Sequence, residues 1–353
     1  MKVLIIKLSA FGDIIHSLCV IDCFKEYSKQ HNETIELHWL VEKKWSPLLQ
    51  NHNDIKRLII SNTKEWRKSI LSSETRRDVF AFWKNLRESE YDLVIDINGL
   101  IRSAVLARMA RAKTRVGFSK NSDCCREKHS AWLLDKTYDV PKGHVVDQTA
   151  GLLERALNIK MPGIINPEFP LDEAVSIKAR NTLTENNLEP ARFSVIAAGG
   201  GWATKLLDVQ SIALFCDRVA RHGIIPVLTY YGDEEGRRAK EISDIAANDV
   251  RELSNLPVDI FIEIMRLSRL VIGPDTGTVH AASAVKTPTV SYYGPSSGDY
   301  SGPRRETDRV VQISPECGPC FKRRCEKGLC SDLEVARVLD AIDEQLEQMV
   351  KDK

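Results

Sequence analysis

The sequence predicts an α/β protein with two Rossmann-like parallel-sheet domains. Short apolar runs rich in β-branched residues alternate with helical patterns along most of the chain, which is typical of βαβ units on a parallel sheet. The alternation stops once, over residues 160–172, and then restarts. A length of 353 residues also suits two cores better than one.

The first half has five expected strands, each a short apolar run that precedes or follows a helical pattern. The strands are expected at 2–8, 35–41, 57–61, 91–97 and 114–119. The helices are expected at 14–30, 64–88, 101–111 and 144–158.

Residues 160–172 hold three prolines and a glycine without periodicity, so we expect a linker there. In the second half, strands are expected at 193–198, 225–231, 270–273 and 288–293. The helices are expected at 208–222, 234–247, 277–285 and 331–350. We therefore predict a first domain over 1–162 and a second over 170–330, with the amphipathic helix 331–350 packing back on the first domain.

Composition narrows the class of protein. Hydrophobic residues make up 43% and charged residues 28%, as in folded cytosolic proteins. Lys plus Arg is 50 and Asp plus Glu is 49, a balance that argues against a bulk nucleic-acid binder. The apolar start lacks a cleavage site and is interrupted at Gly12, so we interpret it as a strand rather than a signal peptide and expect a cytoplasmic protein.

Residues 7–16 (KLSAFGDIIH) lie where the first strand turns into the first helix. Gly12 permits a close backbone approach, and Asp13 would stand at a helix N-terminus, where its ionised form is favoured. Asp13 could serve as a general base. The alternative is that Asp13 only caps the helix.

Two further turns combine glycine with groups that bind anions. Residues 198–205 (AGGGWATK) could bring backbone N–H groups, Thr204 and Lys205 to phosphate oxygens, although a flexible turn would look the same. Residues 273–282 (GPDTGTVHAA) are a sharper signal, because a helix starting near Gly277 would present free N–H groups to a diphosphate. The alternative there is a capping aspartate with a structural histidine. The donor-binding candidates of this second turn are Asp275, Thr276, Gly277, Thr278 and His280.

Glu234 and Glu235 follow another strand. A carboxylate there could accept hydrogen bonds from a ribose diol, or it could only interact favourably with the helix dipole. A cysteine-rich loop spans 317–330, and a structural zinc or iron ion is one interpretation of it. Four free thiols are the other. The candidate ligands are Cys317, Cys320, Cys325 and Cys330.

Basic residues recur in the first half and could line an anionic acceptor site, or could belong to solvated helix faces. They are Lys64, Arg67, Lys68, Arg102 and Arg126.

Together these motifs resemble the ADP-heptose:lipopolysaccharide heptosyltransferase family, nearly end to end. The resemblance lies in VLIIKLSAFGDIIHSL, YDLVIDINGLIRSAVLAR, GGGWATK, YGDEEGRRA, GPDTGTVHAASAVKTPTVSYYGP and HVVDQTAGLLERAL. The middle segment is most similar to the heptosyltransferase I branch, whose members add the first heptose to the Kdo region of the inner core. The chain departs from the family at 206–208 (LLD), where an aromatic residue and a proline are expected.

The resemblance implies a GT-B fold, with two Rossmann-like domains facing across a cleft, and inverting transfer of heptose from ADP-heptose. It implies Asp13 as catalytic base, Lys205 on the donor phosphates, the 275–280 turn as donor loop and one of Glu234 and Glu235 on the ribose. It also implies a lipid-linked Kdo acceptor. We expect no metal for catalysis, peripheral contact of a monomer with the cytoplasmic face of the inner membrane, and no nucleic-acid partner.

Three rival functions differ in testable ways. Another acceptor, such as a later core heptose or a protein hydroxyl, would use the same donor loop. A nucleotide-sugar epimerase or dehydrogenase would need a GxGxxG turn after the first strand, and residues 9–13 lack it. A metal-stapled binding protein without turnover would have no need of Asp13, Lys205 and Asp275 together.

Overall fold

The computed structural model describes residues 1–50, 52–163, 165–170, 172–313, 315, 317–326, 330 and 335–351. The chain divides into two compact units, Met1–Pro167 and Glu168–Lys353. The division falls within the expected linker 160–172. Each unit contains one six-stranded sheet in which all pairs of neighbouring strands are parallel. The two parallel-sheet domains predicted from the sequence are therefore confirmed.

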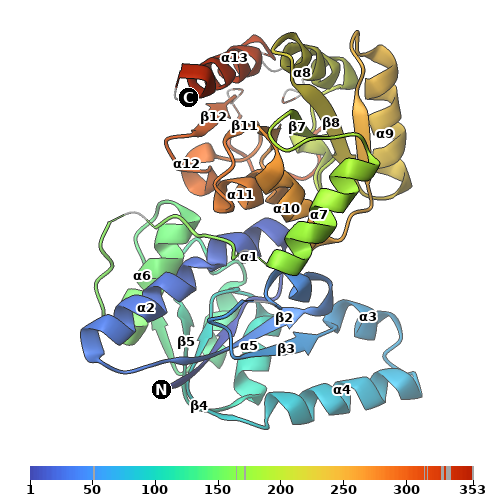
Figure 1. Cartoon of the computed structure of the whole chain (residues 1–353). Helices are drawn as coiled ribbons and strands as arrows, with labels where there is room; N and C mark the ends of the chain where they lie inside the picture. Colours follow the sequence, from blue (N-terminus) through green and yellow to red (C-terminus); the bar gives the residue numbers. More distant parts are fainter. Residues whose placement is uncertain are drawn as a thin grey trace. The chain divides into compact units, whose positions relative to one another are not determined.

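The first unit has strand order β3-β2-β1-β4-β5-β6 with helices on the sheet (Figure 1). Its strands are β1 (Lys2–Ile6), β2 (Glu36–Glu42), β3 (Arg57–Ser61), β4 (Glu90–Asp96), β5 (Arg111–Phe118) and β6 (Lys136–Tyr138). Its helices are α1 (Phe11–Ser17), α2 (Cys19–His31), α3 (Thr63–Lys68), α4 (Ser73–Leu86), α5 (Ile101–Met109) and α6 (Val145–Leu157), with 3-10 turns η1 (Lys43–Leu48) and η2 (Lys128–Leu133).

Central strand β1 shows why this sheet forms. Val3, Leu4, Ile5 and Ile6 are all fully buried, as expected for a parallel strand covered on both faces. Neighbours β2 and β4 flank β1 in parallel register. The carboxyl ends of these three strands therefore lie at one edge of the sheet, where the loops carrying Lys7 and Asn98 begin and where α1, which holds Asp13, follows.

The second unit has strand order β12-β11-β10-β7-β8-β9. Its strands are β7 (Phe193–Ala197), β8 (Ile225–Tyr230), β9 (Arg251–Ser254), β10 (Val271–Pro274), β11 (Thr289–Tyr293) and β12 (Asp308–Gln312). Its helices are α7 (Glu173–Glu185), α8 (Val209–Arg221), α9 (Gly232–Ile245), α10 (Val258–Leu267), α11 (Gly277–Ala284), α12 (Gly298–Ser301) and α13 (Val335–Lys351), with the 3-10 turn η3 (Ala203–Lys205).

The last helix differs from its prediction. We expected helix 331–350 on the first domain, but α13 packs on α8, β11 and β12 of the second unit. Val338 and Ile342 are fully buried in the core of that unit. Residues 331–334 of the predicted range lie outside the described residues. An amphipathic pattern requires a buried face but does not determine which surface covers it.

The expected helix 64–88 is two helices, α3 and α4, separated by residues 69–72. Ser72 starts the second one, because its side chain accepts a hydrogen bond from the backbone N–H of Thr75 at 3.0 Å. Among the described helices, none is long and apolar enough to span a membrane.

Candidate active site

Asp13 lies in the first turn of α1, directly after the loop that follows β1. Its carboxylate accepts a hydrogen bond from the backbone N–H of Ala10 at 3.2 Å, so Asp13 does cap the helix. The cap occupies only part of the carboxylate, since 23% of the Asp13 side chain remains exposed. Capping and a role in chemistry are therefore compatible at this position.

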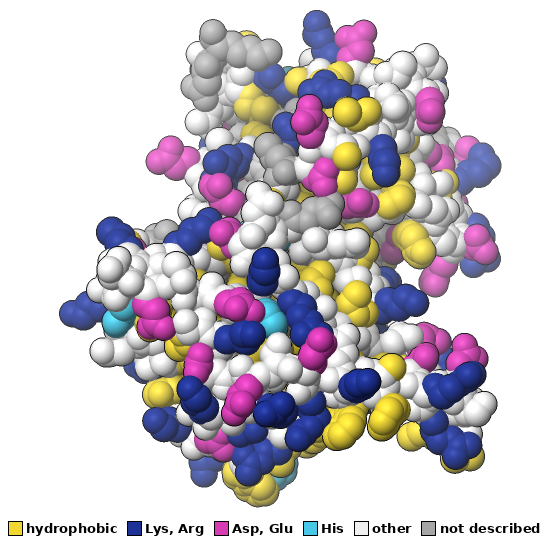
Figure 2. Space-filling view, turned by 60° about the horizontal axis from the view of Figure 1, so that its bottom comes forward, with side chains coloured by type: hydrophobic (Ala, Val, Ile, Leu, Met, Phe, Trp, Pro, Cys, Tyr) yellow, Lys and Arg dark blue, Asp and Glu magenta, His cyan; other side chains and the backbone are white. Residues whose placement is uncertain are grey.

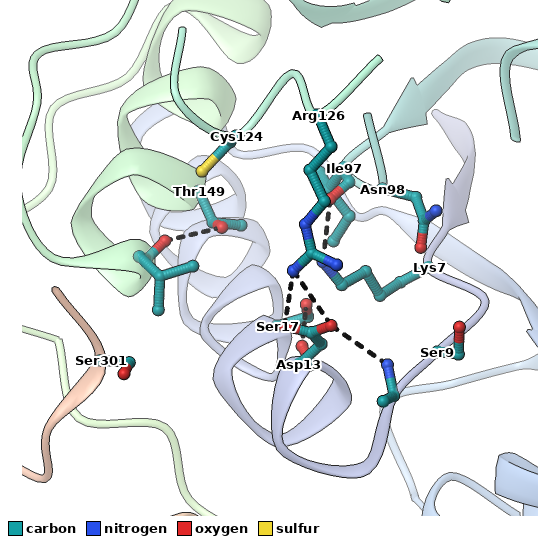
Figure 3. A network of polar contacts seen from close by, with 12 residues as sticks. Lys7, Ser9, Asp13, Ser17, Ile97, Asn98, Cys124, Arg126, Thr149 and Ser301 are labelled. Atoms are coloured by element: carbon teal, nitrogen blue, oxygen red, sulfur yellow. Dashed lines mark hydrogen bonds and ion pairs between the residues drawn. The ribbon is translucent and has the colours of Figure 1, made fainter. Parts of the chain in front are cut away.

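Two cations lie near Asp13: Lys7 from the loop before α1, and Arg126 from a distant part of the sequence (Figure 3). The Arg126 guanidinium donates to both carboxylate oxygens of Asp13, at 3.1 and 3.2 Å. Lys7 is 7% exposed, and its ammonium donates to the carbonyl oxygen of Ile97 at 3.1 Å. Helix start, arginine and buried lysine together form a positive environment for one carboxylate.

The balance of burial and charge keeps Asp13 ionised. Burial alone would raise the pKa of Asp13, but the charges of Lys7 and Arg126 and the hydrogen bond from Ala10 outweigh it, so the pKa is lowered. Burial lowers the pKa of Lys7, and the Asp13 charge opposes that shift. A carboxylate held in the charged form at neutral pH can accept a proton.

Further polar groups fix the loops around Asp13. The Asn98 side chain accepts from the backbone N–H of Leu8 at 3.2 Å, and Arg102 donates to the Ser9 hydroxyl at 3.0 Å. Asp96 is fully buried, accepts from Ser103 at 2.9 Å, and has its pKa raised to about 6 by burial. These contacts join the loops after β1 and β4 into one framework.

The basic residues predicted to line an acceptor site differ in their contacts. Arg126 pairs with Asp13, and Arg102 lies 3.9 Å from the buried Glu42 carboxylate. Lys64, Arg67 and Lys68 are exposed on α3, where Lys68 pairs with Glu65 at 2.8 Å.

In the second unit, the glycine turn after β7 meets the turn after β10. The Lys205 ammonium donates to the Asp275 carboxylate at 2.6 Å and to the Asp275 carbonyl oxygen at 2.8 Å. His280 Nε2 lies 3.0 Å from the other carboxylate oxygen, and the Ser301 hydroxyl donates to that oxygen at 3.4 Å. The structure thus brings Lys205 to Asp275 and His280, which lie 70 or more residues further along the sequence.

Asp275 is a firmly ionised group. Burial opposes its charge, but His280 and Lys205 together hold the pKa of Asp275 well below its usual range. An ammonium group has three N–H donors, and Lys205 uses two of its three in the hydrogen bonds to Asp275. One donor of Lys205 is left for another acceptor.

Helix α11 begins at Gly277, directly after this turn, with Thr276 as its N-cap residue. The first N–H groups of a helix have no partner within the helix, and its N-terminus carries partial positive charge. The Thr276 hydroxyl is buried and makes no hydrogen bond within the described part of the chain. Thr278 is half-buried one residue after Gly277. The turn therefore offers donors suited to an anion.

Glu234 and Glu235 are distinguished by their contacts. Glu235 accepts from the backbone N–H of Tyr231 at 2.9 Å and lies against Gly199, where an added Cβ would come within 2.2 Å of its carboxyl carbon. Glu234 is exposed. Of the two, Glu235 is the carboxylate beside the glycine turn.

The four cysteines predicted as metal ligands are all free thiols, with Cys317 and Cys325 exposed and Cys330 buried. Burial raises the pKa of the Cys330 thiol, and the neighbouring thiols Cys320, Cys317 and Cys325 raise it further. Among the described residues, however, no group of three or more His, Cys, Asp or Glu side chains is arranged to hold a metal ion. As placed, the thiols do not form a ligand set.

Two residues beside Asp13 and Lys205 were given no role by the sequence prediction. Lys7 was part of the first motif, and a lysine at the end of an otherwise apolar strand was the available signal. Trp202 lies between motif residues, and its ring centroid is 4.5 Å from the Lys205 ammonium.

Comparison with known proteins identifies the family. The family model of glycosyltransferase family 9 (heptosyltransferase) matches residues 79–330. The chain belongs to this family. The resemblance seen in the sequence is thus confirmed, and the protein is a glycosyltransferase.

Curated members of the heptosyltransferase family match most of the chain. Lipopolysaccharide heptosyltransferase 1 of Pseudomonas aeruginosa is 26% identical over 328 residues, covering 92% of this chain and 87% of the relative. Lipopolysaccharide heptosyltransferase 1 of Escherichia coli K12 is 25% identical over 317 residues, covering 90% and 95%.

A solved structure of this heptosyltransferase family shares the fold. E. coli heptosyltransferase WaaC with ADP has a TM-score of 0.78 at 24% identity, covering 98% of this chain and all of the other. The E. coli ADP-heptose lps heptosyltransferase II has a TM-score of 0.76 at 19% identity, with 99% of each chain covered. The GT-B class expected from the sequence is confirmed at the level of the fold of each unit.

Proposed function

We propose that this glycosyltransferase moves heptose from ADP-heptose to the Kdo region of the lipopolysaccharide inner core, with inversion at the anomeric carbon. The observation that carries the proposal is Asp13, one ionised and partly exposed carboxylate held between Lys7 and Arg126. The relatives named lipopolysaccharide heptosyltransferase 1, which match most of the chain, support the donor and acceptor classes. The alternative is the same donor with a different acceptor hydroxyl.

Asp13 is proposed as the general base. A sugar hydroxyl holds its proton tightly, so the base has to accept that proton as the new glycosidic bond forms. Arg126 is the more exposed partner in the ion pair, with 51% of its side chain accessible. An acidic group of the acceptor can therefore compete with Asp13 for Arg126. Arg126 would then pair with Asp13 in the free enzyme and contact the acceptor in the complex. Arg102, Lys64, Arg67 and Lys68 are proposed as further acceptor contacts.

The donor is proposed to bind at the turns after β7 and β10. As the bond from the anomeric carbon to ADP lengthens, negative charge grows on the diphosphate. The remaining Lys205 donor and the free amides at the start of α11 suit that charge, and such prearranged donors contribute a few kcal/mol each. Asp275 holds Lys205 and His280 in place rather than contacting phosphate, because like charges repel. Thr276, Gly277 and Thr278 add donors, Thr204 is proposed to contribute through its backbone because its hydroxyl donates to the Lys322 carbonyl oxygen, and Glu235 is proposed as the ribose-binding carboxylate.

These groups would take over the charge stabilisation that a divalent ion supplies in other transferases, so we propose chemistry without a metal. We propose separately that the four cysteines bind one zinc or iron ion, which is structural because four protein ligands leave no open position for substrate. Metal analysis of the purified protein tests this second proposal. About one ion per chain supports it, and a stable metal-free protein contradicts it.

We further propose that α3, α4 and the loop between them contact an anionic membrane surface. Ile70 and Leu71 in the loop and Phe80 and Trp83 on α4 are exposed, at 68%, 84%, 64% and 40%. The Phe80 and Trp83 rings stack at 5.8 Å. Residues 63–88 also hold seven Lys and Arg against four Asp and Glu.

Apolar side chains among cations are typical of a surface that inserts into the lipid interface while attracting acidic headgroups. Figure 2 shows hydrophobic and basic side chains side by side on the face of the first unit that is turned toward the viewer. A surface of this kind would bring the enzyme to a lipid-linked acceptor.

The decisive experiment is transfer from ADP-heptose to Kdo-lipid A, read by mass spectrometry. We expect the mass of one heptose to be added by the wild-type protein. Asp13→Ala should still bind ADP but lose transfer by at least about 100-fold, the contribution typical of a general base. A fully active Asp13→Ala variant would remove the base assignment. Donor consumption that needs an acceptor other than Kdo-lipid A would favour the alternative.

A further inference from the structure

The cysteine-rich loop docks on the glycine turn that carries Lys205. The Thr204 hydroxyl donates to the backbone carbonyl of Lys322 at 2.8 Å. The Arg323 guanidinium lies 5.1 Å from the ring centroid of Trp202. Two neighbouring residues of the loop thus contact two residues of one short turn.

A second pair of contacts holds the loop from its other side. The Phe321 backbone N–H donates to the Pro295 carbonyl oxygen at 2.8 Å, and its ring meets Tyr300 edge-on at 6.0 Å. Phe321 has a positive φ of 54°, which a bulky residue adopts only where its surroundings require it. Arg323 is therefore presented from a fixed point rather than from a free strand of chain.

Trp202 connects two cations. The Lys205 ammonium is 4.5 Å from the same ring centroid, so the two charged groups lie within about 10 Å of each other. The indole face attracts both by the cation–π effect. Two cations at one turn attract an anion more strongly than either cation does alone.

The charges at this turn show what Arg323 adds. The charge of Lys205 is offset by its 2.6 Å ion pair with Asp275. Arg323, by contrast, has no acidic partner within 4.0 Å in the part of the chain that the structure describes. A diphosphate carries at least two negative charges and requires more cation than the Lys205–Asp275 pair supplies.

We propose that Arg323 is a second cationic ligand of the donor diphosphate, held over the glycine turn by Trp202. This inference rests on the proposed donor site and adds to it a residue from the cysteine-rich loop. Arginine suits the task, because its planar fork can donate two hydrogen bonds to one phosphate and still stack on an aromatic ring.

Calorimetric binding of ADP and of adenosine to the full-length protein tests the proposal. We expect Arg323→Gln to weaken ADP binding roughly tenfold, the loss typical of one charge-assisted hydrogen bond. Adenosine has no phosphate, so its affinity should stay within about twofold. Arg324→Gln removes the neighbouring exposed charge and is the matched control, with wild-type affinity expected for both ligands. Arg323→Lys should recover part of the lost ADP affinity.

The outcomes separate the two levels of the argument. If the wild-type protein does not bind ADP, the proposed donor site fails, and the Arg323 assignment fails with it. If Lys205→Ala weakens ADP binding and Arg323→Gln does not, the donor site stands and the Arg323 assignment is wrong. If Arg323→Gln weakens ADP and adenosine equally, Arg323 supports the fold of the site and is not a phosphate ligand.

Discussion

Replacing Arg126 with glutamine tests how Asp13, the proposed base, is kept ionised. The Asp13–Arg126 pair is partly exposed, and such pairs contribute about 0.2–1 kcal/mol. Since about 1.36 kcal/mol corresponds to one pKa unit, the change should raise the pKa of Asp13 by about 0.15–0.7 unit. Lys7→Met replaces a buried charged side chain with an uncharged one of similar volume, and it should raise the pKa of Asp13 further.

The assay is the pH profile of kcat/KM for heptose transfer, together with NMR titration of the Asp13 carboxyl. A base is active above its pKa, so a raised pKa moves the acidic limb of the profile to higher pH. Loss of an acceptor contact alone would lower the whole profile without moving that limb. Arg108→Gln, which breaks the 2.8 Å ion pair with Asp135 elsewhere, is the control and should leave the limb in place. An Arg126→Gln limb that coincides with wild type, or moves to lower pH, would refute the reasoning.

Three further outcomes are expected. Lys205→Ala should raise the Kd for ADP roughly 10- to 100-fold and slow transfer as well, measured by calorimetry and initial rates, and an unchanged Kd would remove Lys205 from the donor site. The double change Phe80→Ser and Trp83→Ser should abolish flotation of the protein with vesicles of acidic phospholipid. Ile177→Ser, at an exposed position of the second unit, is the control and should not affect flotation. Equal flotation of the two variants would rule out the α4 surface as a membrane contact. Ile342→Ala should destabilise the protein by about 2–5 kcal/mol in denaturant unfolding, because the side chain is fully buried, and a loss below about 0.5 kcal/mol would contradict the packing of α13.

The sequence predicted the central strands of each sheet and the edge strand β3, but it missed the edge strands β6, β9 and β12. β1 is a run of buried apolar residues, which has few other interpretations. β6, β9 and β12 lie at sheet edges, are three to five residues long and include exposed positions, so they lack a continuous apolar run. Short edge strands depend on a neighbouring strand that local pattern does not reveal.

For the candidate site as well, the sequence predicted local features but not the contacts between distant segments. The motifs placed Asp13, Lys205 and Asp275 at strand-to-helix turns, because Gly and helix-start chemistry are local. Contacts between distant segments were not predictable. Arg126 is 113 residues from Asp13, and it was expected to bind the acceptor rather than to pair with the base. Lys205 and Asp275 are 70 residues apart, and only the parallel order of β7 beside β10 brings their loops together.

Two carboxylates with lowered pKa values lie near helix N-termini in this enzyme, and physical chemistry separates their proposed roles. Asp275 is 8% exposed and its oxygens accept from Lys205, His280 and Ser301, so an incoming hydroxyl has little access to this carboxylate. Asp13 is 23% exposed, and its principal partner is an arginine that is itself half in solvent. Release of that exposed pair costs little, whereas breaking a buried pair costs about 3–5 kcal/mol. Asp13 can therefore give up its partner to take a proton, while Asp275 serves best by holding Lys205 still.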